Sequence, residues 1–365
     1  MSKKNVAILT FHRAVNYGAI LQTYALQTIL QENKYHVEIL DYRCDVIEEY
    51  YYSFIKGKHG IKEVISSFLT FAKQKKRNNA FKKFYDTSLN ISMNSYKRET
   101  VEKSQEIYDK FVVGSDQVWN LPCIGCDLTY FLDFVSDDQK KCSYAISCGK
   151  YKVCIDDYKM CYPYIQRFSN ISLREDEGRN FLAQNVKREM KIDVDPTFLL
   201  SKERWMEVAE NTTEYSNYVL LYSVNLNADV LRAARKTARD NGKKLVIITL
   251  RNKKIHLERE EYDSSTCSPY EFIGLINRAD IVITNSFHGT VFSILLEKEF
   301  YLVRNQEAGL DNSRLDMLLK MVELESRIWN GEVDYDSKID YINVNDIVEK
   351  LRENSISNLL GYMSS

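Results

Sequence analysis

One histidine in this chain stands where a side chain could both bind an anion and transfer a proton. His288 follows the β-branched run Ile281–Ile283 and three polar residues, and it precedes Gly289 and Thr290. The run predicts a buried strand, and the apolar spacing after Gly289 predicts a helix that Ser286 could cap. A helix start binds anions through its free N–H groups and its macrodipole, and its field favours a neutral imidazole. The alternative is a polar helix cap with a histidine at the surface.

A carboxylate follows another predicted strand, in the segment Asp109–Asn120. Gly114 and Ser115 are small enough to let a ligand approach the backbone closely. Asp116 and Gln117 then offer a proton acceptor and a hydrogen-bond donor at the end of the strand. Asp116 could instead serve as a helix cap.

An arginine, Arg174, directly follows a third predicted strand, Asn170–Leu173. Arg174 could hold an anionic ligand through paired N–H groups. It could equally form an ordinary salt bridge at the surface.

The first loop of the chain joins a predicted strand, Val6–Thr10, to a predicted helix, Ile20–Gln31. In α/β sheets, ligands bind outside the carboxyl ends of the strands, where such loops lie. The polar or small residues of this loop that could line a ligand site are His12, Asn16, Tyr17 and Gly18.

The elements that position these residues follow an alternating strand and helix pattern, which predicts an α/β fold with two Rossmann-like, doubly wound domains. A chain of 365 residues also exceeds the roughly 250–300 residues that one core supports. We expect a first domain over residues 1–200, a second over 201–330, and a helical tail over 331–365 that packs back on the body. Two such domains imply a ligand cleft between them. The strands predicted beyond those above are Val37–Tyr42, Lys141–Ser147, Asp193–Thr197, Tyr218–Val224, Lys244–Thr249 and Phe300–Arg304.

A helical, basic insertion is predicted near residues 46–100 of the first domain. Between Lys56 and Lys83 the chain has nine Lys and Arg residues against one acid, Glu63. Such a run is usually a solvated helix face. The alternative is a docking surface for an anionic acceptor or for an anionic membrane, which would place the protein peripherally at the inner face of the membrane.

The composition excludes several classes of protein. Lys and Arg total 50 against 51 Asp and Glu, so a nucleic-acid-binding protein, which would show a basic excess, is not expected. The short apolar run near the N-terminus does not resemble a signal peptide, and no stretch approaches the length of a membrane span. We therefore expect a cytoplasmic protein whose cysteines are thiols. Cys123 and Cys126 have ligand-like spacing, but without a second such pair we predict no metal site.

Six segments of the chain form a set of motifs: Asn16-Tyr-Gly-Ala-Ile-Leu-Gln22, Phe111-Val-Val-Gly-Ser-Asp-Gln-Val-Trp119, Ser143-Tyr-Ala145, Ile171-Ser-Leu-Arg-Glu175, Asp195-Pro-Thr197 and Ser286-Phe-His-Gly289. Taken together, these motifs resemble the polysaccharide pyruvyl transferase family. The resemblance covers roughly residues 5–320, with the motifs in the family's order. It implies a glycosyltransferase GT-B-like fold and transfer of a pyruvyl group from phosphoenolpyruvate to sugar hydroxyls of a cell-surface polysaccharide, giving a pyruvate ketal.

The chain departs from the family at one position. Better-known members have Arg-Leu-His-Gly where this chain has Ser286-Phe-His-Gly289, so an arginine expected to help hold the donor is missing. Its replacement is predicted among Arg174, Arg251, Arg304 and Arg314.

The resemblance implies roles for the residues introduced above. The donor carries a phosphate and a carboxylate, and the reaction needs an acid at its methylene carbon and a base for the sugar hydroxyl. We expect His288 and Asp116 to be catalytic, with phosphoenolpyruvate as co-substrate and neither a metal nor another cofactor. The predicted donor-binding residues are Arg174, Ser286, Gly289, Thr290, Arg251 and Arg314. The predicted acceptor-binding residues are His12, Asn16, Tyr17, Gly18, Ser115, Gln117 and Trp119, the last as a stacking platform unless it is a core residue.

Two alternatives remain open from the sequence. The first is a GT-B glycosyltransferase that uses a nucleotide sugar, although no ribose or base contact can be identified. The second is a non-catalytic partner in a polysaccharide-assembly complex. For a pyruvyl transferase and for a glycosyltransferase alike, the acceptor would be a saccharide, free or linked to a lipid.

Overall fold

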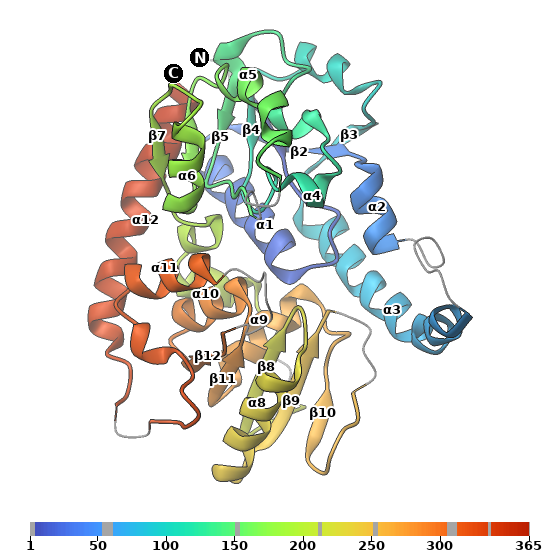
Figure 1. The fold of residues 1–365 in the computed structure, drawn as a ribbon, viewed down its shortest axis with the longest axis vertical. Helices are drawn as coiled ribbons and strands as arrows, with labels where there is room; N and C mark the ends of the chain where they lie inside the picture. Colours follow the sequence, from blue (N-terminus) through green and yellow to red (C-terminus); the bar gives the residue numbers. More distant parts are fainter. Residues whose placement is uncertain are drawn as a thin grey trace.

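Two five-stranded parallel sheets form the framework of the chain in the computed structural model (Figure 1). The structure describes residues 4–52, 61–149, 154–210, 214–250, 255–304, 312–334 and 337–364, with the backbone alone for 61–70. The first sheet has the strand order β3-β2-β1-β4-β5, and the second has the order β10-β9-β8-β11-β12. Counted from its own first strand, each sheet therefore has the order 3-2-1-4-5, which is the Rossmann order 3-2-1-4-5-6 without its sixth strand.

The central strands of both sheets form because their residues are almost continuously apolar and are buried on both faces. In β4 and β8, for example, every residue is buried, as expected for parallel strands covered by helices on two sides. The strands are β1 (Asn5–Leu9), β2 (His36–Tyr42), β3 (Ile91–Tyr96), β4 (Lys110–Val113), β5 (Lys141–Ser143), β6 (Ile171–Leu173), β7 (Met190–Ile192), β8 (Tyr218–Ser223), β9 (Lys244–Thr249), β10 (Glu261–Asp263), β11 (Ile281–Thr284) and β12 (Glu299–Leu302).

A separate parallel pair, β6 and β7, extends the first sheet. Isolated bridges from Cys142 to Asn170 and from Ile146 to Leu173 connect the pair to the β5 side. The α-helices are α1 (Tyr17–Glu32), α2 (Asp45–Tyr52), α3 (Ile61–Ser88), α4 (Leu121–Ile124), α5 (Tyr162–Ile165), α6 (Asp176–Ala183), α7 (Lys202–Val208), α8 (Ala228–Asp240), α9 (Pro269–Arg278), α10 (Phe287–Leu295), α11 (Ser313–Met321) and α12 (Tyr341–Ser364).

The two domains pack directly on each other through α1. The ring of Tyr17 stacks on Phe272 of α9, with centroids 4.3 Å apart and planes 8° from parallel. The Tyr17 hydroxyl donates a hydrogen bond of 2.9 Å to the carbonyl of Cys267. One hydrophobic core runs through both domains at this contact. The domain interface is therefore closed in this structure.

The C-terminal helix α12 spans both domains (Figure 1). The backbone N–H of Val194 donates to Ser355 Oγ of α12 at 3.1 Å, and Tyr362 and Asn358 donate to the Asp193 carboxylate at 2.9 and 2.7 Å. These contacts anchor the end of the chain beside β6 and β7.

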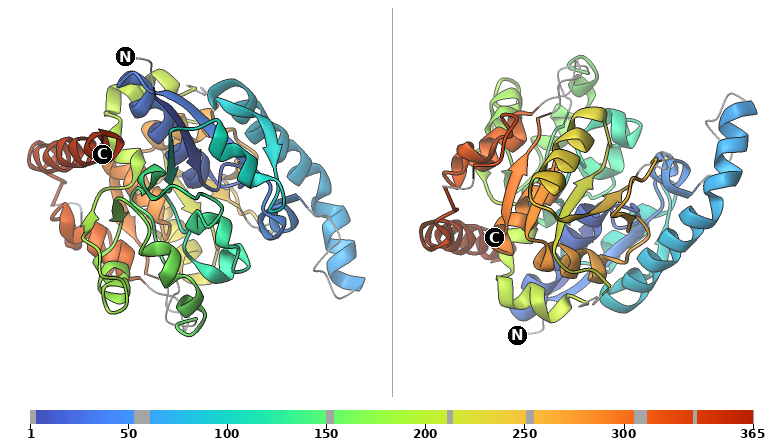
Figure 2. Two further views of the ribbon diagram at one scale, coloured as in Figure 1. Left: turned by 90° about the horizontal axis from the view of Figure 1, so that it is seen from above. Right: turned by 90° about the horizontal axis from the view of Figure 1, so that it is seen from below.

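The helix α3 projects from one side of the first domain and also contacts the second (Figure 2). Lys73 forms an ion pair of 2.5 Å with Asp263, and Arg77 is buried. These two cations of the predicted basic surface thus face the protein, whereas Lys75, Lys76 and the pair Lys82–Lys83 are exposed. Residues 53–60 and the side chains of 61–70 lie outside the described part of the chain.

One predicted strand was misplaced, and two strands were not predicted. The strand expected at Asp193–Thr197 lies earlier, at β7, because Pro196 begins a 3-10 turn and removes an N–H donor. The sequence analysis missed β3, a polar edge strand in which Met93 is fully exposed. It also missed β10, which has three residues and only partly buried side chains.

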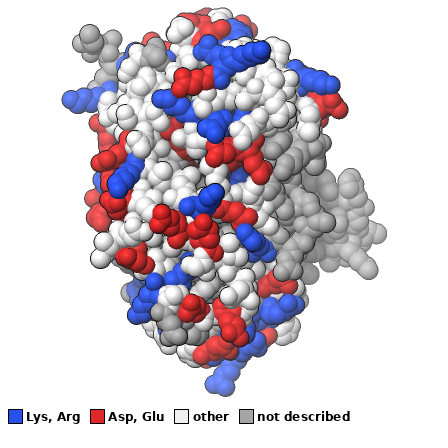
Figure 3. Space-filling model, turned by 60° about the vertical axis from the view of Figure 1, so that its left-hand side comes forward, with Lys and Arg blue, Asp and Glu red and all other residues white. Residues whose placement is uncertain are grey.

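Charged residues of both signs are interspersed over the face on which α12 lies (Figure 3). Among the described residues, no helix has the length and apolar composition needed to cross a bilayer.

Candidate active site

The candidate site lies where the central strands of the two sheets end. In each sheet the order reverses between its first and fourth strands, between β1 and β4 and between β8 and β11. Ligands of doubly wound sheets bind at such switch points. Asn16 follows β1, Asp116 follows β4 and His288 follows β11, so the predicted residues of both domains meet at the domain interface.

The imidazole of His288 is held between the two domains. Its Nε2 lies 3.4 Å from the Asp195 carboxylate of the first domain. Its other nitrogen, Nδ1, lies against Gly18, where a Cβ would overlap the ring. The side chain is 10% exposed. Gly18 is therefore required for the approach of α1 to the histidine, and this packing fixes the orientation of the ring.

Asp195 joins the histidine to a buried arginine. Arg174 Nη1 donates to Asp195 Oδ2 at 2.6 Å, and Thr197 donates to Oδ1 from its backbone and hydroxyl at 3.1 and 2.7 Å. Burial alone would raise the pKa of Asp195, but His288 and Arg174 outweigh it and hold that pKa well below its ordinary value. Asp195 therefore stays ionised and can orient the imidazole.

Arg174 is the centre of the cluster. Besides Asp195, it lies 3.7 Å from Asp116 and 3.8 Å from Glu175, and its guanidinium carbon lies 4.3 Å from the centroid of the Phe287 ring. Burial lowers the pKa of an arginine, but the three carboxylates outweigh this effect and raise the pKa of Arg174. The guanidinium is thus a permanent charge linked to both domains.

Glu175 differs from its neighbours because burial raises its pKa above the ordinary 4.5, although Arg174 and Arg314 oppose this. A carboxyl whose pKa is raised by folding stabilises the fold most below its unfolded pKa. This contribution is lost as the pH rises through the folded pKa.

We therefore predict that Glu175→Gln gains stability relative to the wild type as the pH rises above about 4.5. The measurement is the free energy of unfolding in urea from about pH 4 to about pH 8. Glu102→Gln, at an exposed position, is the matched control and should follow the wild-type curve. Parallel curves for Glu175→Gln and the wild type would contradict the raised pKa.

The start of α10 leaves fewer N–H groups for an anion than the sequence suggested. The Gly289 N–H donates to the capping Ser286 Oγ at 3.5 Å, and the Thr290 N–H donates to the Ser286 carbonyl at 3.0 Å. Thr290 is fully buried, and a Cβ at Gly289 would overlap Thr284. Gly289 and Thr290 thus shape the helix start, so an anion there would depend on the amides of Phe287 and His288.

The loop after β4 has an unusual backbone. Asp116 has a φ of 71° and Ala145, on the neighbouring loop, a φ of 44°. Both lie in the left-handed region, which residues with a Cβ adopt at an energetic cost and often at functional sites. Gly114 has a φ of 127°, and a Cβ there would overlap the Tyr144 carbonyl. This conformation directs Asp116 toward Arg174.

The cations predicted to replace the missing arginine separate into three groups. Arg174 and Arg314 line one narrow cavity of about 20 Å³, together with Asp195 and Phe287. Arg304 instead pairs with Asp316 at 2.8 Å on the surface. Arg251 lies outside the described residues and stays a prediction.

Three predicted acceptor-side residues do not line the site. Trp119 is fully buried, stacks on Phe131 and donates to a backbone carbonyl, so it is a core residue and not a stacking platform. Tyr17 is fully buried in the domain interface. His12 is buried beside β2, with Nδ1 3.0 Å from the Thr10 carbonyl and Nε2 3.3 Å from Asp41.

The other predicted acceptor-side residues lie at or near the cluster. Asn16 and Gln117 are half-buried, but Asn16 caps α1 and Gln117 accepts a hydrogen bond from Asn120. Ser115 is fully buried, with its hydroxyl 3.5 Å from Asp195. Asn16 and Asp116 thus retain solvent access at the edge of the cluster.

The sequence analysis missed Asp195, Glu175 and Phe287 as site residues. All three lie within motifs quoted above, but only the fold brings them to His288. In the described residues, no group of three or more His, Cys, Asp or Glu side chains is arranged to hold a metal ion. Cys123 and Cys126 are exposed, unbridged thiols.

Comparison with solved structures supports the two-domain fold. The chain is similar to the UDP-GlcNAc 2-epimerase of Methanocaldococcus jannaschii in complex with UDP-GlcNAc and UDP, at 12% identity and a TM-score of 0.55, over 100% of this chain and 99% of that one. It is also similar to the enzyme of Neisseria meningitidis bound to UDP-GlcNAc, at 9% identity and a TM-score of 0.50, over 99% of both chains. Together with the strand order of the sheets, these similarities identify a GT-B-like fold.

A comparison with curated proteins gave no match. The sequence model of the polysaccharide pyruvyl transferase family matches residues 16–307. This stretch includes the switch point between β8 and β11, together with Asp116, Arg174, Asp195 and His288. The chain therefore belongs to the polysaccharide pyruvyl transferase family and is a transferase of polysaccharide biosynthesis.

Proposed function

We propose that this protein transfers a pyruvyl group from phosphoenolpyruvate to two hydroxyls of a sugar in a cell-surface polysaccharide or its lipid-linked precursor. The observation that carries the proposal is the Arg174–Asp195–His288 cluster at the domain interface. Phosphoenolpyruvate has a phosphate and a carboxylate, so its site needs fixed cations and N–H donors. Arg174, Arg314 and the start of α10 would supply them, and Arg251 remains a further candidate.

The chemistry assigns a different role to each member of the cluster. His288, oriented by Asp195, would protonate the methylene carbon of the donor, which makes the adjacent carbon electrophilic. Asp116, at the edge of the cluster with its side chain 13% exposed, would accept the proton of the attacking hydroxyl. The second hydroxyl would displace the phosphate, which would take up the proton of that hydroxyl, so that the products are a pyruvate ketal and inorganic phosphate.

The site must open before a donor can bind. The cavity beside Arg174 has a volume of about 20 Å³, which is the size of a single water molecule. His288 and Gly18 are in contact across the interface. We therefore expect the domains to separate for binding and to close on the donor, which would exclude water from the reaction.

The test combines a binding measurement with product analysis. Phosphoenolpyruvate should raise the midpoint of thermal unfolding, because a ligand at a hundredfold excess over its Kd stabilises a protein by about 2.7 kcal/mol. UDP-GlcNAc, the comparison ligand, should not. Mass spectrometry of candidate glycans incubated with phosphoenolpyruvate should then show the added pyruvyl mass. Stabilisation by UDP-GlcNAc alone would favour a nucleotide-sugar glycosyltransferase instead.

A further inference from the structure

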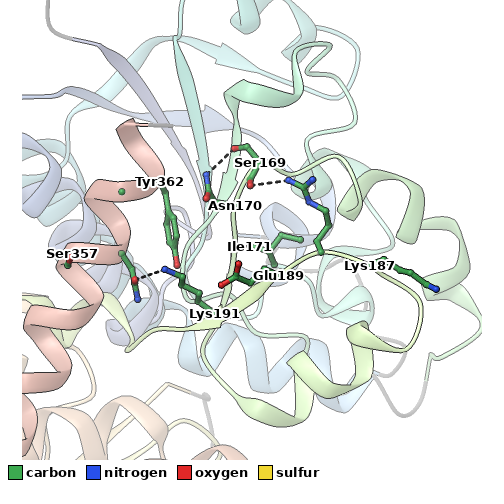
Figure 4. Close-up of a pocket in the computed structure, with 11 residues that line it drawn as sticks. Ser169, Asn170, Ile171, Lys187, Glu189, Lys191, Ser357 and Tyr362 are labelled. Carbon is green, nitrogen blue, oxygen red and sulfur yellow. Dashed lines mark hydrogen bonds between the residues drawn. The ribbon is translucent and has the colours of Figure 1, made fainter.

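A second pocket lies outside the domain interface, between β6, β7 and the C-terminal half of α12 (Figure 4). Its volume of about 630 Å³ is within the usual range of ligand sites. Asn170, at the mouth of the pocket, precedes β6, whereas Arg174 of the cluster follows it. Four residues of extended strand separate the two by roughly 13 Å. The pocket is thus not part of the candidate active site.

The pocket carries positive charge that nearby carboxylates do not neutralise. Lys187, Arg188 and Lys191 line it, with Glu189 as the one acidic residue of the lining. Among the described residues none of the three cations forms an ion pair. Arg188 donates to the carbonyls of Phe168 and Ser169, and Lys191 donates to Asn358 of α12 at 3.0 Å (Figure 4).

Two other hollows of the surface differ in this respect. The cations that line them are paired, among them Arg304 with Asp316 and Arg232 with Asp229 in one, and Arg98 with Asp133 in the other. A surface pocket lined by three cations and one carboxylate attracts anions, because bringing a counter-charge there lowers the electrostatic energy.

A glycine on α12 lies at the wall of the pocket. Gly361 is the fourth residue from the end of α12 and lines the pocket. A Cβ at this position would meet no atom within 4 Å, so packing does not require the glycine. We expect a long side chain at this position to reach into the pocket.

The remaining lining favours a polyhydroxylated ligand. Ser169, Asn170, Ser357 and Asn358 supply hydroxyl and amide groups, and Ile171 is the single aliphatic side chain. Such a lining lacks the apolar contacts with which a protein enters a lipid surface. The ring of Tyr362 is 4% exposed, so it presents no open face on which a nucleobase could stack.

We propose that this pocket binds the anionic, pyruvylated glycan that the enzyme produces. The inference rests on the proposed function, in which each transfer adds one ketal carboxylate to an otherwise neutral sugar. The carboxylate would meet Lys187, Arg188 and Lys191, and the sugar hydroxyls would meet the amides and hydroxyls of the lining. A polymer held here by its modified part would keep its unmodified part near the domain interface, so that successive transfers occur on one chain.

The binding test uses a synthetic galactoside oligosaccharide that carries pyruvate ketals, and its ketal methyl ester as the uncharged control. Titration by calorimetry without any donor should detect the acid form and not the ester. The double change Lys187→Glu/Lys191→Glu should weaken binding by about tenfold or more, and binding should weaken as salt rises. Arg239→Glu/Lys350→Glu alters the overall charge equally at exposed positions and should bind like the wild type.

A second variant tests the pocket without changing its charge. Gly361→Gln places a side chain in the pocket where no neighbour is displaced, so it should fold normally and lose binding. Equal affinity of wild type and both pocket variants would overturn the proposal, as would inorganic phosphate that binds as tightly as the ketal.

Activity separates this inference from the proposed function. With a short acceptor, the pocket variants should transfer at the wild-type rate, because the pocket takes no part in the chemistry. With a long polymer, they should release chains that carry fewer ketals. If the wild type transferred no pyruvyl group to any acceptor, the proposed function would be refuted. The titration without donor would still decide whether the pocket binds the ketal.

Discussion

Replacing His288 by glutamine is expected to lower the rate of pyruvyl transfer by roughly 10²–10⁴-fold, the usual contribution of a positioned proton donor. Glutamine keeps a polar side chain of similar size but cannot carry the proton. Asp195 keeps its bonds to Arg174 and Thr197 in the variant, so the midpoint of thermal unfolding should change by only a few degrees. The measurement is the single-turnover rate with phosphoenolpyruvate and a saccharide acceptor, next to the thermal midpoint.

Two controls define the outcome of this experiment. His36→Gln alters an exposed histidine in β2 and should leave the rate unchanged. The affinity of His288→Gln for phosphoenolpyruvate should stay within a few-fold of the wild type, because Arg174 and Arg314 remain. A rate within a few-fold of the wild type would show that His288 only packs against Gly18 at the domain interface.

Much of this framework could be predicted from local pattern. The strands β1, β4, β8 and β11 are buried on both faces, so their apolar runs predict them directly. The polar strand β3 carries no such signal, because it lies at the edge of its sheet and exposes Met93. The local sequence pattern thus identifies the central strands. The ligand site can then be placed where these strands end, at the switch point of the strand order.

The composition of the site could be predicted only in part, because burial depends on distant segments. Trp119 and Tyr17 occupy the same kind of position after a strand as Asp116 does. Packing on Phe131 removes the first from the surface, and packing on Phe272 of the other domain removes the second. Neither partner can be inferred from the loop itself.

The same limit applies to the partners of His288. Asp195 and Arg174 come from two separate segments of the first domain, and His288 comes from the second. A family motif marks each segment, but the spacing along the chain does not say that Asp195 lies between the other two. The pairing of the domains creates this cluster.

Replacing Arg174 by methionine should destabilise the protein by about 3–5 kcal/mol, the cost of removing one partner from a buried ion pair. Methionine has a similar length, so the packing against Phe287 is largely kept while the charge is lost. Asp195 and Glu175 are 1% and 6% exposed. Without the guanidinium, Asp195 loses its ion pair of 2.6 Å, and Glu175 retains only the weaker effect of Arg314 among the arginines that act on it. The free energy of unfolding in urea measures the effect.

The matched control for this change is Arg179→Met in α6. Arg179 forms an ion pair of 2.7 Å with Asp176, but both side chains are well exposed, so its loss should cost less than about 1 kcal/mol. Adding Asp195→Asn to Arg174→Met should restore part of the lost stability, because the second change removes the charge that the first left without its partner. If the two changes were additive, or if Arg174→Met behaved like Arg179→Met, Arg174 would not be the charge that holds the carboxylates of the cluster together. Since Arg174 also touches Phe287 beside His288, its loss should abolish transfer even in the fraction of protein that remains folded.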